Sequence, residues 1–222
     1  MSMISQGAPG MRPSSVAKRR AILAAAEEAF LAAHYDSVTM DDLANSSGVS
    51  KQTVYAHFGT KEQLFIELVT SMTAGAGDNL DELDGIPDDE ADLAPYFMQY
   101  AIDEMQIVMT PRLLRLRRLV IGEVSRFPEL AQALFENGPQ RSVQSLTIVI
   151  SKLVQRGLLT APSPVVAATT LNWLVLAAPI NETMLLGDGA IPTTAAMKTH
   201  AAEATRVFLT AYATNTGRDD LR

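Results

Sequence analysis

Between residues 39 and 61 the sequence gathers polar side chains that suit contact with a nucleic acid. Gln52 can offer a donor and an acceptor together to the edge of an adenine, and Lys51 can donate to a guanine. Thr53, Tyr55 and His57 can donate to phosphate oxygens, which sets the register of a protein on a duplex without reading its bases. The spacing of these residue types predicts a DNA-binding element.

Two short helices joined by a tight turn are expected to position these side chains. Thr39 is a suitable N-cap for the first helix, and acidic residues occupy its first turn. Gly48 supplies the left-handed backbone that such a turn requires, and Ser50 caps a second helix that runs to about Phe58. Thr39 and Lys61 each stand at a predicted helix start, where free N–H groups favour an anion.

The second of these helices has two different faces. Val54 and Phe58 are one turn apart and should point into the fold, whereas Lys51 and Tyr55, also one turn apart, should project together on another face. This pattern is typical of a helix-turn-helix, whose second helix enters the major groove of DNA. The alternative, a helical corner with a solvated polar face, stays open on spacing alone because short helix–turn–helix patterns are common.

The charge distribution is compatible with an N-terminal part that approaches phosphates. The net charge of −7 argues against nucleic-acid binding over the whole surface. Residues 1–61 nevertheless carry six Lys and Arg against five Asp and Glu, a net charge of +1, so the remainder carries −8. Lys18, Arg19 and Arg20 form a basic run that could contact the DNA backbone further out.

The composition excludes several other classes of protein. With 222 residues, of which 47% are hydrophobic and 19% charged, the chain has enough apolar material for a folded core of one or two domains. It has no cysteine, which excludes thiolate catalysis, iron–sulfur clusters, thiolate zinc sites and disulfides, and its three histidines hardly provide a metal site. The sequence also lacks a nucleophile-elbow motif. We therefore expect no catalytic residue, no metal and no cofactor, and we expect that the protein is not an enzyme.

No association with a membrane is expected. Residues 1–15 lack the basic and then apolar layout of a signal peptide. The longest apolar stretch, 165–186, is interrupted by Asn172, Pro179 and Glu182, and its continuous part is too short to cross a bilayer of about 30 Å. A buried interface helix is the preferred interpretation of this stretch, and a cytoplasmic location is expected.

The hydrophobic pattern is helical almost throughout, so the predicted fold is all-α with about nine helices. Residues 1–15 are expected to form a disordered leader, 16–65 a three-helix helix-turn-helix domain, 66–214 a C-terminal helical domain, and 215–222 a disordered tail. Prolines at predicted starts and glycines after predicted ends place the C-terminal helices near 91–109, 112–125, 129–156, 163–186 and 193–213.

Several sequence elements follow one another in a specific order within residues 16–65. They are the stretches 22–30 and 38–44, Tyr35, a Val-Ser pair at 49–50, Thr-x-Tyr-x-His-Phe at 53–58 and Lys-Glu-x-Leu at 61–64. In this order they resemble the head of TetR-family repressors. Gln52 stands where that family often has glycine, which suggests a direct base contact. With Lys18, the residues that the resemblance and the spacing assign to DNA binding are Lys18, Thr39, Ser50, Lys51, Gln52, Thr53, Tyr55, His57 and Lys61.

The C-terminal domain shows a shorter resemblance. Residues 117–123 and 126–130 resemble the AefR-like type of TetR C-terminal domain, which implies an effector-binding and dimerisation domain over residues 66–214. An effector pocket is expected to have apolar walls and a few polar groups from apolar helices. The candidate residues are Phe97, Tyr100, Met105, Met109, Phe135, Trp173, Asn172 and Glu123. Each of these side chains could equally fill the core, and Asn172 or Asn181 could serve a dimer interface. The implied effector is an unidentified small molecule, apolar or aromatic.

The predicted helices near 163–186 and 193–213 are the candidates for a dimer interface. Two copies of each could build a four-helix seam from Leu171, Leu174 and Leu185 on the first and Val207, Phe208 and Ala211 on the second. A homodimer places two reading helices one DNA turn apart, so the expected target is a near-palindromic operator of double-stranded DNA.

The resulting hypothesis is a one-component transcriptional regulator, a repressor, that an effector releases from DNA by shifting the helix over 61–74. An enzyme is the first alternative, and it lacks a recognisable nucleophile and base. A protein-binding or architectural dimer with a degenerate head is the second. The intact Tyr55, His57, Phe58 and Lys61 argue against such decay.

Overall fold

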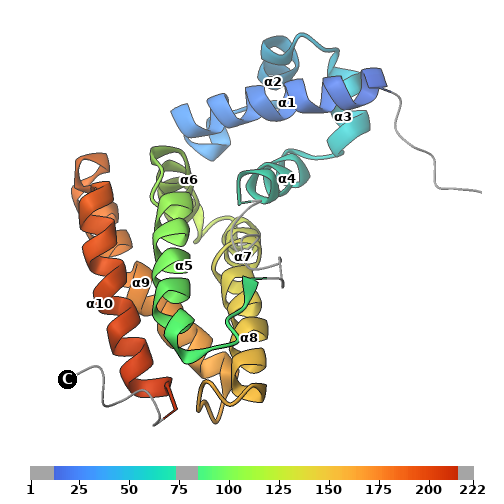
Figure 1. Cartoon of the computed structure of the whole chain (residues 1–222). Coiled ribbons are helices and arrows are strands. Elements are labelled where there is room, and N and C mark those ends of the chain that lie inside the picture. The colour runs from blue at the N-terminus through green and yellow to red at the C-terminus, as the bar shows by residue number, and fades with distance from the viewer. Residues whose placement is uncertain (1–12, 74–84, 215–222) are drawn as a thin grey trace, which may run out of the picture. The chain divides into compact units, whose positions relative to one another are not determined.

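The computed structural model describes residues 13–73 and 85–214, and these residues form ten α-helices (Figure 1). The all-helical fold predicted from the sequence is confirmed. The helices are α1 (Pro13–Ala32), α2 (Met40–Ser47), α3 (Lys51–Phe58), α4 (Lys61–Thr73), α5 (Leu93–Val108), α6 (Pro111–Glu123), α7 (Pro128–Asn137), α8 (Pro139–Gln155), α9 (Pro164–Leu186) and α10 (Thr194–Tyr212), with short 3-10 turns at Tyr35–Ser37, Glu90–Asp92 and Asp188–Ala190.

Two boundaries differ from the sequence prediction. The single helix expected over 129–156 is two helices, α7 and α8, because Gly138 leaves helical geometry (φ −112°, ψ −98°) and Pro139 has no N–H to continue the helix. Residues 13–15, which were expected in the leader, are also helical, since α1 begins at Pro13, and proline suits the first turn of a helix. The rest of the leader and the expected tail lie outside the described residues.

The chain divides into two compact units, which meet in sequence between Leu68 and Val69. Helix α4 runs through this boundary, so it supplies its first turns to one unit and its last turn to the other.

The N-terminal unit has a continuous apolar core. Phe30 of α1, Tyr35 and Phe65 of α4 form a cluster of aromatic rings with centroids 5.0 to 5.4 Å apart. Val54 and Phe58 of α3 are buried with them, as the sequence predicted. Helix α3 packs against α2, and the burial of Val54 and Phe58 determines which side of α3 faces solvent.

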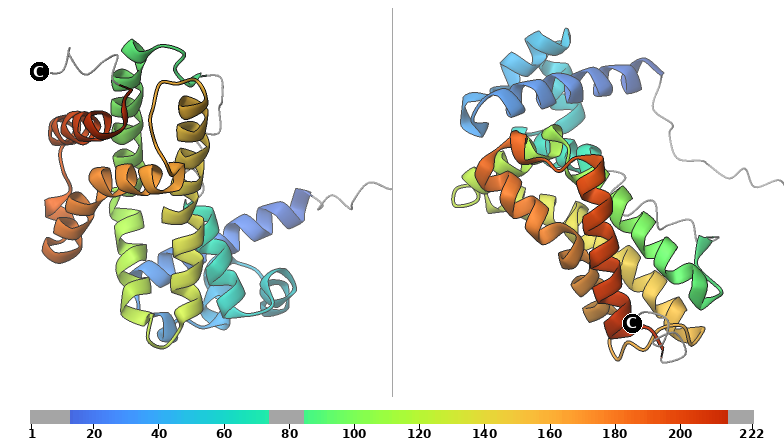
Figure 2. Two further views of the ribbon diagram at one scale, coloured as in Figure 1. Left: turned by 90° about the horizontal axis from the view of Figure 1, so that it is seen from below. Right: turned by 60° about the vertical axis from the view of Figure 1, so that its left-hand side comes forward.

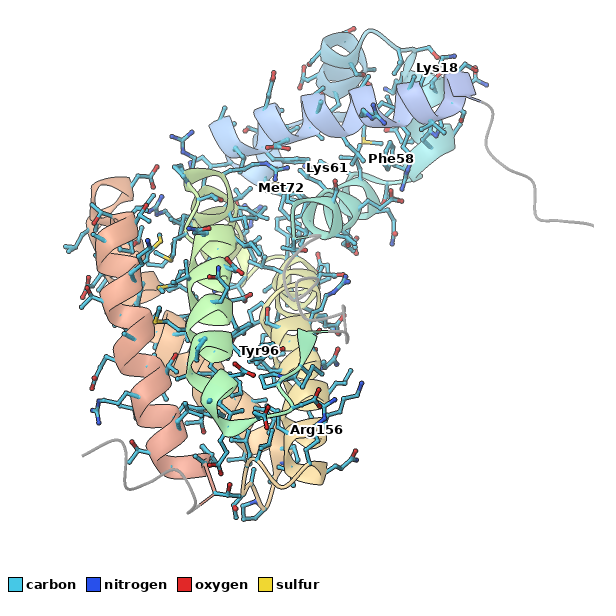
Figure 3. All side chains as sticks on the ribbon, in the orientation of Figure 1. Lys18, Phe58, Lys61, Met72, Tyr96 and Arg156 are labelled. Atoms are coloured by element: carbon cyan, nitrogen blue, oxygen red, sulfur yellow. The ribbon has the colours of Figure 1, made fainter. Side chains whose placement is uncertain are left out.

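The C-terminal unit is a bundle in which α5 packs beside α10 and α8 beside α9 (Figures 1 and 2). The rings of Phe97 on α5 and Phe208 on α10 meet with centroids 5.0 Å apart. Arg156, at the end of α8, donates to the carbonyl oxygens of Ile86 (2.8 Å) and Pro87 (2.6 Å), and it is labelled in Figure 3. These bonds hold the segment that leads into α5.

Helix α9 is the longest and most apolar helix of the described residues. By length and composition alone it could cross a membrane, but a core helix of a soluble protein meets the same test. One side of α9, including Leu171 and Val175, is fully buried in the bundle. Elsewhere along α9 large apolar side chains are exposed, among them Trp173 and Leu185.

Candidate functional site

The turn between α2 and α3 is held by two N-caps and a glycine. Thr39 Oγ1 accepts from the Asp42 N–H (3.2 Å), and Asp42 Oδ2 accepts in return from the Thr39 N–H (3.2 Å) and hydroxyl (2.6 Å), which completes a capping box. Gly48 has φ +67°, the left-handed conformation that glycine adopts without steric cost. Ser50 Oγ then accepts from the Thr53 N–H at 3.2 Å and caps α3.

Helix α3 presents the predicted polar face to solvent. Lys51, Gln52 and Tyr55 are exposed, whereas Val54 and Phe58 are buried. The other predicted contact residues are also accessible in whole or in part: Lys18, Thr39 and Ser50 are exposed, and Thr53, His57 and Lys61 are half-buried. The structure therefore brings Ser50, Lys51, Gln52, Thr53, Tyr55 and His57 together on one short helix and its cap.

Lys51 forms an ion pair that sequence analysis missed. Its Nζ lies 2.7 Å from Asp41 Oδ1, in the first turn of α2, and 6.0 Å from the centre of the Tyr55 ring. The hydrogen bond to Asp41, followed by the charge of that carboxylate, raises the pKa of Lys51. From the sequence, Asp41 could be identified only as an acidic residue at a helix start. Its contact with Lys51 depends on how α2 and α3 cross.

Two further cations of this unit have internal partners. Lys61 Nζ donates to the carbonyl oxygens of Tyr35 (3.0 Å) and Val38 (3.1 Å) and lies 4.3 Å from the centre of the Tyr35 ring. Its ammonium thus holds the segment between α1 and α2 to the start of α4. Arg19 pairs with Glu67, and its guanidinium lies 5.0 Å from the centre of the Phe58 ring. Figure 3 labels Lys18, Phe58 and Lys61 within this unit.

The residues predicted to line an effector pocket lie either in the buried interior or on the surface. Phe97, Tyr100, Met105 and Met109 belong to the buried core of the C-terminal unit, because apolar side chains at helical spacing fill the bundle. Phe135 and Trp173 are exposed over 56% and 52% of their surface. Asn172 and Glu123 are buried, and Glu123 pairs with Arg126 at 3.7 Å.

A cavity of about 40 Å³ lies instead among residues that the sequence analysis did not select. Ser142 Oγ donates to Glu104 Oε1 at 2.7 Å on its wall. The only sequence signal for it was a pair of acidic residues, Asp103 and Glu104, within the apolar helix α5. The lining residues come from α4 to α9, and they are Thr73, Glu104, Val108, Leu113, Arg117, Leu134, Gly138, Pro139, Ser142 and Leu176.

The polar groups at this cavity are strongly affected by burial. Burial raises the pKa of Glu104, and the hydrogen bond from Ser142 opposes this shift. Burial also lowers the pKa of Arg117. One turn before Glu104, the Tyr100 hydroxyl is buried without a hydrogen-bond partner in the described residues. Its pKa is raised well above the usual value by burial and by the nearby Glu104.

The residues predicted for a dimer interface divide into two groups. Leu171 and Phe208 were assigned wrongly, because both are fully buried inside the protomer. Helical spacing identified them as buried but could not say by which surface. The remaining four, Leu174, Leu185, Val207 and Ala211, are half-buried or exposed. A shallow surface groove on α9 is lined by Val166, Thr169, Thr170, Trp173 and Leu174.

Within residues 13–73 and 85–214, no group of three or more His, Asp or Glu side chains is arranged to hold a metal ion. The site defined by α2 and α3 is that of a helix-turn-helix DNA-binding protein. Residues 22–68 match the TetR family of bacterial regulatory proteins, and residues 97–214 match the C-terminal domain of AefR-like transcriptional repressors. The chain belongs to the TetR family of transcriptional regulators and is a DNA-binding regulator.

Individual relatives agree with this assignment. A solved TetR-family transcriptional regulator from Mesorhizobium loti is 33% identical, with a TM-score of 0.81, and the match covers 91% of this chain and 100% of that one. The flavonoid-responsive regulator FrrA is 25% identical, with a TM-score of 0.71, over 89% of this chain and 98% of its own.

Curated relatives match a smaller part of the chain. The HTH-type transcriptional regulator EthR of Mycolicibacterium smegmatis is 30% identical over 76 residues, which are 34% of this chain and 35% of EthR. The chain therefore aligns with about a third of the length of this relative. The family and the fold are those of transcriptional regulators and not of enzymes.

Proposed function

We propose that the protein is a one-component repressor that binds a near-palindromic operator as a homodimer and is released by a small molecule bound in its C-terminal unit. The observation that carries the proposal is the orientation of α3. Val54 and Phe58 anchor the helix in the core, and this leaves Lys51, Gln52 and Tyr55 exposed on a helix of the right size for a major groove.

The predicted contacts fall into two roles. Gln52 and Lys51 read base edges, and Lys51 exchanges its bond to Asp41 for one to a base when DNA binds. The other residues bind phosphates and so set register and affinity. They are Lys18, Thr39, Ser50, Thr53, Tyr55, His57 and Lys61.

The exposed side of α9 supports a homodimer. Val166 and Trp173 on its first half and Leu185 and Leu186 at its end are exposed over 52 to 75% of their surface. On α10, Val207 is also exposed. Large apolar side chains that gather on one helix indicate a surface that a partner covers, and a two-fold axis lets the same surface cover itself.

The cavity of the C-terminal unit supports control by a small molecule. Thr73, in the last turn of α4, lines the cavity, and the same helix begins at Lys61, whose side chain holds the helix-turn-helix unit together. An occupant that moves Thr73 therefore acts on α4. A difference of a few kcal/mol in its affinity for two positions of α4 is enough to release DNA. The proposal also places the protein in the cytoplasm.

Footprinting on the DNA that flanks the gene of this protein tests the proposal. The expected result is protection of two half-sites related by a dyad and about 34 Å apart, with affinity that falls steeply as salt increases. Protection of one isolated half-site, or no protection at low salt, would contradict it.

The dimer is tested by light scattering on two matched variants. Trp173→Glu adds a charge to the exposed side of α9 and should give a monomer that binds DNA weakly. Phe135→Glu adds the same charge at an equally exposed aromatic residue of α7 and should remain dimeric. A dimeric Trp173→Glu protein would move the interface away from α9.

A further inference from the structure

Among the residues that the structure describes, Arg117 is a cation without a partner at the cavity of the C-terminal unit. Its side chain is half-buried on α6, and no hydrogen bond or ion pair joins it to any residue of 13–73 or 85–214. Neighbouring arginines of α6 differ: Arg118 donates to Asp188 Oδ1 (2.7 Å) and to the Thr183 carbonyl oxygen (2.9 Å), and Arg115 lies 3.6 Å from Asp188. A charge that is partly removed from water and has no partner is costly, so Arg117 destabilises the free protein unless something else binds it.

A carboxyl group lines the same cavity but does not neutralise Arg117. Glu104 is 3% exposed and is bonded to Ser142, and it forms no ion pair with the guanidinium. The remainder of the wall is mostly apolar, with Val108, Leu113, Leu134, Pro139 and Leu176. The cavity thus has a cationic group, a separate carboxyl–hydroxyl pair and an apolar wall.

We propose that the effector is an aromatic carboxylic acid that also carries a hydroxyl group: its carboxylate pairs with Arg117, its ring packs on the apolar wall, and its hydroxyl bonds to Glu104 and Ser142. An arginine binds a carboxylate through two parallel N–H donors, which gives both affinity and orientation. This inference rests on the proposed control by a small molecule and names the chemical class of that molecule.

The size of the cavity indicates how binding changes the protein. A volume of about 40 Å³ holds a water molecule or two but not an aromatic ring, so the walls must move apart when the ring enters. Thr73 and Gly138 come from different elements and are neighbours on this wall, since a Cβ added to Gly138 would lie 3.9 Å from Thr73 Cγ2. Entry of the ring therefore displaces the last turn of α4.

Calorimetry and DNA release with hydroxylated benzoates, naphthoates and cinnamates, each compared with its methyl ester, test this assignment in the intact protein. The ester keeps the ring and the hydroxyl but loses the negative charge. At least one acid should bind tenfold or more tightly than its ester and should release DNA at lower concentration. If no acid of the panel binds at millimolar concentration, the proposed ligand class is wrong.

Arg117→Met, with Arg115→Met as the matched control on the same helix, identifies the residue responsible. Arg117→Met should bind acid and ester equally, whereas Arg115→Met should keep the preference of the native protein. Without ligand, the thermal midpoint of Arg117→Met should be unchanged or higher, since an unpaired buried charge is removed. A lower midpoint would assign Arg117 a structural role and overturn the proposal.

The outcomes separate this inference from the proposed function. If the neutral esters bind and release DNA as well as the acids do, control by a small molecule is upheld and the ligand class is wrong. If acids bind at Arg117 but DNA is not released, the ligand class is upheld and the proposed mode of regulation fails.

Discussion

His200 Nε2 lies 3.0 Å from the carbonyl oxygen of Val175, between α10 and α9. In a regular helix this carbonyl would accept the N–H of residue 179, but residue 179 is proline and has none. With its Nε2 protonated, the histidine supplies the missing donor from a neighbouring helix. The pair stabilises α9, which continues for 23 residues with a proline inside it.

Removal of the imidazole should therefore be costly only while the proline is present. His200→Ala should lower the free energy of unfolding by about 1–2 kcal/mol, because a helix carbonyl loses its donor. In a Pro179→Ala background the backbone N–H is restored, and the same substitution should cost clearly less. Denaturant unfolding of the four proteins of this double-mutant cycle measures the coupling, and additive effects would show that the two residues act independently.

Base reading and phosphate binding should respond differently to substitution. Gln52→Ala should weaken operator binding by about 1–3 kcal/mol and reduce the preference over random DNA. His57→Ala should weaken binding to operator and random DNA by similar factors and should reduce the salt dependence. Fluorescence anisotropy with both DNAs at several salt concentrations distinguishes base reading from phosphate binding. An equal loss of affinity for operator and random DNA in Gln52→Ala would show that Gln52 does not read bases.

The ion pair between Asp41 and Lys51 should limit DNA affinity. In Asp41→Asn, Lys51 has no ion pair to break before it contacts DNA, and the negative charge beside α3 is removed. We expect affinity to rise about threefold to fivefold. Glu28→Gln makes the same change of charge on an exposed side of α1 and serves as the control in the same titration. Equal gains in the two variants would reduce the effect to net charge.

Glu104 should make the protein less stable as pH rises. Burial raises its pKa in the folded state, so the folded protein holds this proton more tightly than the unfolded chain does. The stabilisation is complete below the unfolded pKa and is lost as pH rises through the folded value. Glu104→Gln, which cannot ionise, should gain stability over the native protein between acidic and neutral pH. Urea unfolding across this range measures it, and parallel pH profiles would exclude Glu104 as the cause.

The local architecture of the DNA-binding unit was predictable because short-range rules determine it. Thr39 and Ser50 are N-caps, Gly48 takes a positive φ, and Val54 and Phe58 are buried, all as the sequence indicated. These features depend on neighbours within a few residues along the chain. The partners of Lys51 and Lys61 were not predictable, since they depend on how separate helices cross.

Short-range rules predicted less of the C-terminal unit. Apolar spacing predicted that Phe97, Leu171 and Phe208 would be buried, but it could not distinguish a core, a pocket and a dimer interface. The break between α7 and α8 lies at Gly138 and Pro139, two helix-breaking residues that the prediction of a single helix over 129–156 overlooked. The cavity was not predicted because its walls come from six helices, and only the packing of these helices brings Glu104 and Arg117 to the same cavity.

The length of α4 has a mechanical consequence. Its 13 residues make a rod of about 20 Å, so a tilt of about 5° at one end displaces the other by roughly 2 Å. A shift of that size exceeds the tolerance of a hydrogen bond. The proposed effector, entering beside Thr73, would therefore break hydrogen bonds at the other end of α4 by tilting the helix, without unwinding it.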